Sequence, residues 1–216
     1  MTFSGLPDEA FWFYEGLEAD NSRGYWQAHR DTYDQHVRAP VQALCDALEG
    51  EFGPAHLFRP HRDVRFSRDK SPYKTHQGAF VAVEDGIGYY LQVAADGLLV
   101  AAGFRSHAPD QVERYRAAVD DETAGRRLEE IVDALVSAGF ETGGDRLATR
   151  PRGTPPDHPR LDLLRHRSLT ASRHWPPEPW VHTTAVLDRV RDAWHETAPL
   201  VDWVATHVGP TRAPQR

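Results

Sequence analysis

Residues 78–104, "GAFVAVEDGIGYYLQVAADGLLVAAGF", alternate three apolar stretches with two short turn signals. The turns at 84–88 ("EDGIG") and 95–97 ("ADG") combine Asp and Gly, which favour tight hairpin connections. Parallel neighbours need crossovers of about a dozen residues or more, so connections this short imply antiparallel pairing. The stretch therefore predicts three consecutive strands of an antiparallel meander.

Helical patterns precede the meander. In the segments 6–20 and 23–38, apolar residues recur every three or four positions after an acidic or polar start. Pro40 is expected to end the second helix or to open a third one over 40–52. The alternation in 62–67, "RDVRFS", predicts a further strand.

Helical patterns also follow the meander. The expected helices are 109–121, 124–139, a short one at 160–165 and 181–208, the last with a break at Pro199. A Gly/Pro-rich connection covers 142–159, and a strand is expected at 168–175. The order predicts an α+β fold: an antiparallel meander of about four to six strands packed with N-terminal and C-terminal helices. We expect one domain over 1–216, with flexible ends at about 1–5 and 209–216.

Composition narrows the class of protein. The chain has 216 residues, a formal net charge of −7 and one cysteine, Cys45. A single cysteine excludes an internal disulfide and fits a reducing cytoplasm. The apolar pattern around Cys45 predicts that its thiol is buried. No apolar run approaches the roughly 18 residues of a membrane span, and we expect no leader peptide. The acidity argues against binding bulk nucleic acid, while it leaves a local anion site open.

One segment reverses the acidic balance. Between His61 and His76 there are five Lys or Arg residues against two Asp, a local excess of three positive charges. Arg offers a bidentate fork to phosphate or carboxylate, and Lys a mobile point charge. We interpret "RFSRDKSPYK", 65–74, as one wall of an anion pocket. The alternative is a solvated, salt-bridged surface.

Alternation within the predicted strand 62–67 separates its side chains into two faces. Phe66 is expected to face the core with Val64, whereas Arg65 shares the polar face with Asp63 and Ser67. Arg65 and Lys70 could then converge on one anion.

The motifs resemble a bacterial and fungal family called domain of unknown function 2461. Five segments carry the resemblance: "DNSRGYWQAHRDTYDQHVRAP", "RDVRFSRDKSPYKTH", "GYYLQVAADGLLVAAGF", "PRGTPPDHPRLDLL" and "APLVDWV". The resemblance covers nearly the whole chain in the same order and implies one intact domain, without an activity, cofactor or substrate. The signature positions map onto Asn21, Arg23, Trp26, Tyr33, Arg62, Asp63, Arg65, Phe66, Asp69, Lys70, Pro72, Tyr73, Lys74 and Arg152.

The candidate site residues come from three segments: the helix 23–38, the basic motif and the loop "PRGTPPDHP" at 151–159. The ligand-binding candidates are Arg23, Arg62, Arg65, Lys70, Tyr73, Lys74 and Arg152. Arg30 is an alternative to Arg23 on the same helix, and Gly153 would permit close backbone approach to a ligand. We interpret Trp26, Tyr33 and Val37 as core rather than as an aromatic ligand box. The acid/base candidates are Asp69 and His158.

A metal site and a cofactor are not expected. The candidate metal ligands are His56, His61, His76, Asp157 and His158, but their spacing matches no common ligand motif. Phosphate-binding loops, dinucleotide fingerprints and nucleophile elbows are not found.

Three functions remain open. The protein could be an enzyme on a small anionic substrate, with Arg65 and Lys70 holding the anion. It could instead be a binding module for a phosphorylated metabolite, a nucleotide or a nucleic-acid end. The third hypothesis is a protein-interaction domain that uses the aromatics of "RHWPPEPW", 173–180.

Overall fold

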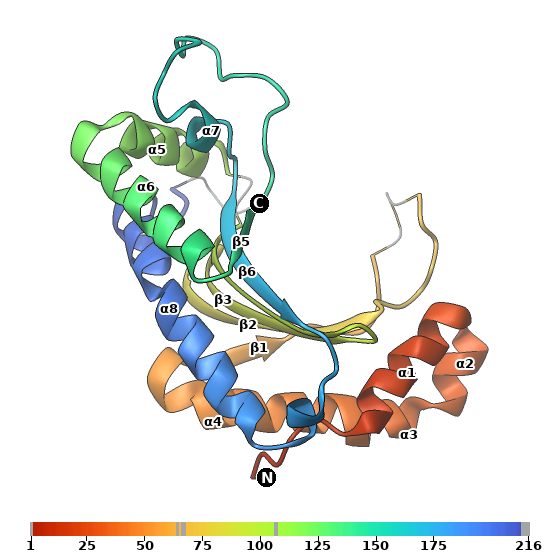
Figure 1. Cartoon of the computed structure of the whole chain (residues 1–216). Helices are drawn as coiled ribbons and strands as arrows, with labels where there is room; N and C mark the ends of the chain where they lie inside the picture. The colour runs from red at the N-terminus through yellow and green to blue at the C-terminus, as the bar shows by residue number, and fades with distance from the viewer. Residues whose placement is uncertain (1, 64, 66–67, 106–107, 213–216) are drawn as a thin grey trace. The chain divides into compact units, whose positions relative to one another are not determined.

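The computed structural model describes residues 2–63, 65, 68–105 and 108–212 (Figure 1). Its strands form one six-stranded sheet with the order β1-β2-β3-β4-β6-β5. The strands are β1 (Ala55–Leu57), β2 (His76–Glu84), β3 (Ile87–Ala94), β4 (Gly97–Phe104), β5 (Glu141–Gly143) and β6 (Leu169–Trp175). The helices are α1 (Asp8–Ala19), α2 (Arg23–Ala28), α3 (Arg30–Thr32), the π-helix η1 (Tyr33–Arg38), α4 (Ala39–Phe52), α5 (Pro109–Asp120), α6 (Glu122–Ser137), α7 (Leu161–Leu164), the 3₁₀ helix η2 (Pro179–His182) and α8 (Ala185–His207).

The predicted meander is confirmed by β2, β3 and β4, which are neighbours in the sheet and are joined by two-residue connections. Gly86 has φ of 74° and Gly97 has φ of 129°, values that a residue with a side chain rarely adopts. A Cβ atom on Gly97 would also lie 2.0 Å from the carbonyl oxygen of Trp175. Antiparallel pairing extends to β1, where Leu57 lies opposite Ala79, and to β5, where Thr142 lies opposite Ala171. The expected α+β class with helices before and after the meander is therefore confirmed.

Two local predictions are wrong. The helix break expected at Pro199 does not occur, since α8 continues from Ala185 to His207 with this proline inside it. Burial of its side chains, among them Trp194 and Val201, stabilises the helix by more than the loss of the one hydrogen bond that the proline removes. Pro40, by contrast, lies in the first turn of α4, where its missing N–H is tolerated, so it opens that helix as expected.

The strand predicted at 62–67 is also not found in its described residues. Arg62, Asp63 and Arg65 lie outside every strand, and β1 pairs with β2 instead. The Asp63 side chain accepts hydrogen bonds from the backbone N–H and the guanidinium of Arg65, which folds the segment on itself. The expected positions of Val64, Phe66 and Ser67 fall outside the described residues.

The chain divides into two compact units. Unit 1 comprises residues 1–81, 90–100 and 174–192, and unit 2 comprises 82–89, 101–173 and 193–216. Each unit therefore takes segments from both halves of the chain, and the boundaries fall within β2, β3, β4, β6 and α8.

The core of unit 1 is formed mainly by α1, α4 and the strand segments. Its fully buried side chains include Leu6, Tyr14, Leu17, Val37, Leu44 and Leu91. Cys45 belongs to this core, and burial raises the pKa of its thiol to about 12, which agrees with a buried, unreactive thiol. The N-terminal segment is anchored because Phe3 is buried and the N–H of Leu6 donates to the carbonyl of Val181.

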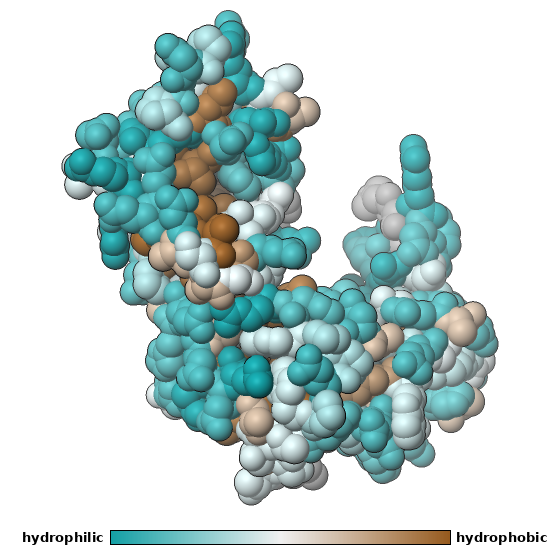
Figure 2. Space-filling model, in the orientation of Figure 1, coloured by the Kyte–Doolittle hydropathy of each residue, from teal (hydrophilic) through white to brown (hydrophobic). Residues whose placement is uncertain are grey.

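Unit 2 has its own core beneath α5, α6 and the second half of α8. Its buried side chains include Phe104, Tyr115, Leu128, Leu169, Trp194 and Val204. Asp121 caps α6 by accepting from the N–H groups of Thr123 and Ala124, and Asp110 accepts from Thr211 and Arg212 near the C-terminus. On the face in view in Figure 2, hydrophobic side chains of unit 2 gather in a band between hydrophilic ones. Among the described residues, no helix is long and apolar enough to cross a membrane.

We expect the whole chain to unfold in one cooperative transition, because neither unit consists of a continuous stretch of sequence. A fragment of residues 1–139 lacks the segment 174–192 of unit 1 and the segment 193–216 of unit 2, and it should stay unfolded. Circular dichroism and tryptophan fluorescence of the full chain should give coincident midpoints in urea. A fragment with its own cooperative transition, or two separated midpoints, would contradict this prediction.

Candidate functional site

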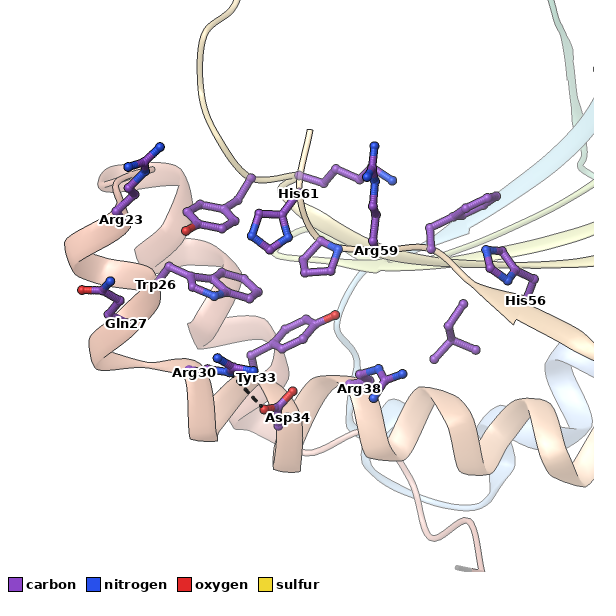
Figure 3. Close-up of a pocket in the computed structure, with 15 residues that line it drawn as sticks. Arg23, Trp26, Gln27, Arg30, Tyr33, Asp34, Arg38, His56, Arg59 and His61 are labelled. Carbon is purple, nitrogen blue, oxygen red and sulfur yellow. Dashed lines mark ion pairs between the residues drawn. The ribbon is translucent and has the colours of Figure 1, made fainter. Parts of the chain in front are cut away.

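A pocket of about 750 Å³ lies wholly within unit 1 (Figure 3). Its lining comes from two sides, which we call the helical wall (residues 23–38) and the strand wall (residues 56–61 and 73–74). The lining residues are Arg23, Trp26, Gln27, Arg30, Tyr33, Asp34, Arg38, His56, Leu57, Phe58, Arg59, Pro60, His61, Tyr73 and Lys74.

The helical wall begins at Ser22, whose hydroxyl caps α2 by accepting from the N–H of Tyr25 at 3.1 Å. The chain then passes through α3 into the π-helix η1, which covers Tyr33 to Arg38. Single π turns re-aim side chains and recur at functional sites. Arg30, Asp34 and Arg38 follow one another along this wall in Figure 3, and the Arg30 Nε atom is 3.7 Å from Asp34 Oδ2.

Aromatic rings fill the space between the walls. Trp26 and Tyr73 stack with ring centroids 4.4 Å apart at an interplanar angle of 10°, and the centroid of Tyr33 is 4.8 Å from that of Trp26. Trp26 is 8 % exposed and Tyr73 is 5 % exposed. The burial of Trp26, Tyr33 and Val37 confirms that these residues belong to the core. The stack joins the two walls through dispersion and apolar burial.

The hydroxyl of Tyr33 links the helical wall to the sheet. It donates to Oε1 of the buried Gln77 at 2.6 Å, while Nε2 of Gln77 donates to the carbonyls of Phe58 and Gly78. Burial raises the pKa of Tyr33 to about 12, so the phenol is neutral at physiological pH. This network fixes the position of Phe58 relative to the helical wall.

The side chain of Asn21 holds the other part of the strand wall. Its Nδ2 atom donates to the carbonyl of Tyr73 at 3.0 Å, and its Oδ1 atom accepts from the N–H of Tyr73 at 3.1 Å. One amide thereby satisfies both backbone groups of a residue 52 positions away. The arrangement resembles the pairing of a strand residue with its neighbour.

A short antiparallel ladder closes the basic loop, which we define as residues 62–72. His61 and Tyr73 form a bridge, the N–H of Arg62 donates to Pro72, and the N–H of Lys74 donates to Pro60. The pocket-lining residues on either side of the loop are thus held together at its base.

Within the basic loop, both carboxylates interact with neighbouring arginines. Arg62 Nη1 donates to Asp69, and Arg65 Nη2 lies 2.6 Å from Asp63 Oδ2. Hydrogen bonds from Ser71 and then from Arg62 lower the pKa of Asp69 to about 2, and those from Arg65 lower the pKa of Asp63 to about 2. Asp69 is therefore ionised near neutral pH and is a poor proton donor there.

The pocket itself has a strongly positive lining. Five cationic side chains face one carboxylate, Asp34, which leaves an excess of four positive charges with the histidines neutral. The cations are Arg23, Arg30, Arg38, Arg59 and Lys74. Burial, and then the charge of Arg59, lowers the pKa of Lys74. Burial, and then Lys74 and Arg62, lowers the pKa of His76. Burial is the larger cause of both pKa shifts, and the neighbouring cations add to it.

The structure brings together some of the predicted ligand-binding residues. Arg23, Tyr73 and Lys74 line the pocket. The other predicted residues of the motif lie on the basic loop, outside the described lining: Arg62, Arg65, Asp69 and Lys70.

Arg152 and His158 belong to unit 2 and do not line this pocket in the described part of the chain. His158 Nε2 is 3.0 Å from Asp120 Oδ1, while its Nδ1 atom accepts from the N–H of Arg160. These contacts join the imidazole to α5 and to the backbone of the buried Arg160.

The sequence reasoning missed two of the five lining cations, Arg38 and Arg59, and the aromatic Phe58. A signal existed for Arg38, since Arg30, Asp34 and Arg38 recur every four residues on one helical stretch. Arg59 lies in an irregular segment after β1, where no helical or strand periodicity indicates which way its side chain points. Of the metal-ligand candidates, His56 and His61 line the pocket, but no described group of three or more His, Cys, Asp or Glu residues is arranged to hold a metal ion.

Comparison with known proteins confirms the family predicted from the motifs. A family model described as "Conserved hypothetical protein (DUF2461)" matches residues 9–203. A search of curated proteins finds no match.

The substitution Asn21→Ala should lower the free energy of unfolding by about 1–3 kcal/mol, because it removes two hydrogen bonds to the backbone of Tyr73. Gln42→Ala is the matched control, since its amide donates one exposed hydrogen bond to Asp46 a helical turn away, and its loss should cost about 0.5 kcal/mol or less. Urea unfolding of both variants measures the difference. Equal losses would show that Asn21 does not anchor the strand wall.

Proposed function

The chain belongs to the DUF2461 family, and we propose that it binds a small phosphorylated or carboxylated ligand in the pocket of unit 1. The observation that carries the proposal is the lining of five cations against one carboxylate in a pocket of about 750 Å³. Small-molecule sites commonly have volumes of about 300–1,000 Å³. The chain as a whole is acidic, so this concentration of positive charge is local.

The two walls supply different cations. The helical wall contributes Arg30 and Arg38, whose planar guanidinium groups suit bidentate contacts with phosphate or carboxylate. The strand wall contributes Arg59 and Lys74. The hydrogen bonds between Asn21 and Tyr73 and the Tyr33–Gln77 network hold the backbone segments that carry these cations, which reduces the entropy cost of ordering the walls on binding.

The proposal concerns binding and assigns no reaction. Asp69 is kept ionised on the basic loop, and His158 bonds to Asp120 in unit 2. An enzymatic role for the pocket is a second hypothesis that product analysis with each bound ligand would test.

The hypothesis of a protein-interaction surface around 173–180 has less support. Trp175 and Trp180 contact each other edge to face at 5.7 Å, and the guanidinium of Arg189 lies 4.2 Å from the ring centroid of Trp180. These rings are therefore engaged within the chain.

Calorimetric titration with pyrophosphate, tripolyphosphate and citrate tests the proposal. Lys74→Ala and Arg38→Ala should each weaken binding by about tenfold or more, since a hydrogen bond to a charged group typically contributes about 1.5–3 kcal/mol. Arg65→Ala and Lys70→Ala are matched controls from the basic loop, and each should change affinity by less than about threefold. All four variants should keep their thermal midpoint within a few degrees, because exposed or half-exposed cations add little to stability.

Two outcomes would contradict the proposed pocket. One is the failure of the wild-type protein to bind any of these anions at millimolar concentration. The other is a larger loss of affinity in Arg65→Ala and Lys70→Ala than in Lys74→Ala and Arg38→Ala, which would move the anion site to the basic loop.

A further inference from the structure

We infer that the ligand of this pocket is a nucleotide, in which a planar base accompanies the phosphate groups. The inference rests on the proposed anion site and deepens it. It starts from Phe58, a large apolar side chain that lines the pocket and is nevertheless 37 % exposed. A phosphate or carboxylate alone gains nothing from such a ring, whereas a nucleobase can stack on it.

The backbone of Phe58 is fixed on both sides of the residue. Its N–H donates to the carbonyl of Gly78 at 3.0 Å, and its carbonyl accepts from Nε2 of Gln77 at 3.0 Å. The ring of His56 meets the Phe58 ring edge to face, with centroids 5.5 Å apart. A ring held in this way is a preorganised platform, so little conformational entropy is lost when a base stacks on it.

A cation already lies against one face of this platform. The Nζ atom of Lys74 lies over the Phe58 ring, 5.1 Å from its centroid, so a base would stack on the opposite face, and Arg59 is the next residue in the chain. A ligand that places a ring on Phe58 would therefore place a neighbouring phosphate within reach of the strand-wall cations. Further phosphates would extend toward Arg38 on the helical wall.

The other large rings of the pocket are less available for stacking. Trp26 and Tyr73 are almost fully buried and stack on each other, and the hydroxyl of Tyr33 is bonded to Gln77. The pocket volume of about 750 Å³ also far exceeds that needed for a single phosphate group. The geometry thus combines an exposed ring, adjacent cations and room for both parts of a nucleotide.

The test compares adenosine triphosphate with inorganic tripolyphosphate, which has the same number of phosphates and lacks the nucleoside. For the wild-type protein, calorimetry should give about tenfold tighter binding of the nucleotide. In Phe58→Ala this preference should fall to less than about threefold, while the affinity for tripolyphosphate stays unchanged. Phe58→Leu, which keeps an apolar side chain without a π face, should behave like Phe58→Ala.

Trp12→Ala is the matched control, because Trp12 is another exposed aromatic residue of unit 1, at 59 % exposure, and it does not line the described pocket. This variant should keep the full preference for the nucleotide. Thermal midpoints of all variants establish that each is folded.

The outcomes separate the two proposals. If tripolyphosphate and the nucleotide bind equally to the wild-type protein, or if Phe58→Ala weakens both alike, the nucleotide inference is overturned while the anion pocket stands. If neither binds, the anion pocket itself fails. A 5′-phosphorylated trinucleotide tests whether the ligand is a nucleic-acid end. If it binds more tightly than the free nucleotide and Phe58→Ala removes this binding, the pocket recognises the base and phosphate of a nucleic-acid end.

Discussion

The pocket of unit 1 depends on the pair of hydrogen bonds between the Asn21 side chain and the backbone of Tyr73. These bonds fix the segment that carries Lys74 against the helix that carries Trp26, and the Trp26–Tyr73 stack then excludes water from the same contact. A primary amide suits this place because it donates and accepts at once. With this segment fixed, the His61–Tyr73 bridge closes the basic loop. The backbone positions of the pocket-lining residues before and after the loop are then fixed.

Opposite charges are distributed unevenly between the basic loop and the pocket. On the loop, Asp63 and Asp69 neutralise Arg65 and Arg62 and accept hydrogen bonds from the local backbone, so their charge organises the loop itself. In the pocket lining, only Asp34 opposes five cations among the described residues. The excess of positive charge is therefore greater in the pocket lining than on the basic loop, where the motif indicated it.

The correct and incorrect fold predictions each have a physical reason. The meander of β2, β3 and β4 was predictable because its two-residue connections, which contain Gly86 or precede Gly97, allow only antiparallel neighbours. The break predicted at Pro199 is wrong because tertiary burial overrides local preference, whereas the described residues of 62–67 form no strand because of local side-chain hydrogen bonds. Burial of its side chains lets α8 keep an internal proline, and the Asp63 carboxylate accepts hydrogen bonds from the backbone and guanidinium of Arg65.

The sequence by itself determined the class of fold, the family and the part of the chain that carries the unusual charge, since each of these depends on local composition, spacing or turn length. It also indicated Arg23, Tyr73 and Lys74, which line the pocket. Only the tertiary structure decided that Arg38, Phe58 and Arg59 join them and that His158 belongs to another unit. The reason is that convergence on a pocket depends on the packing of segments distant in sequence, to which no local pattern is sensitive.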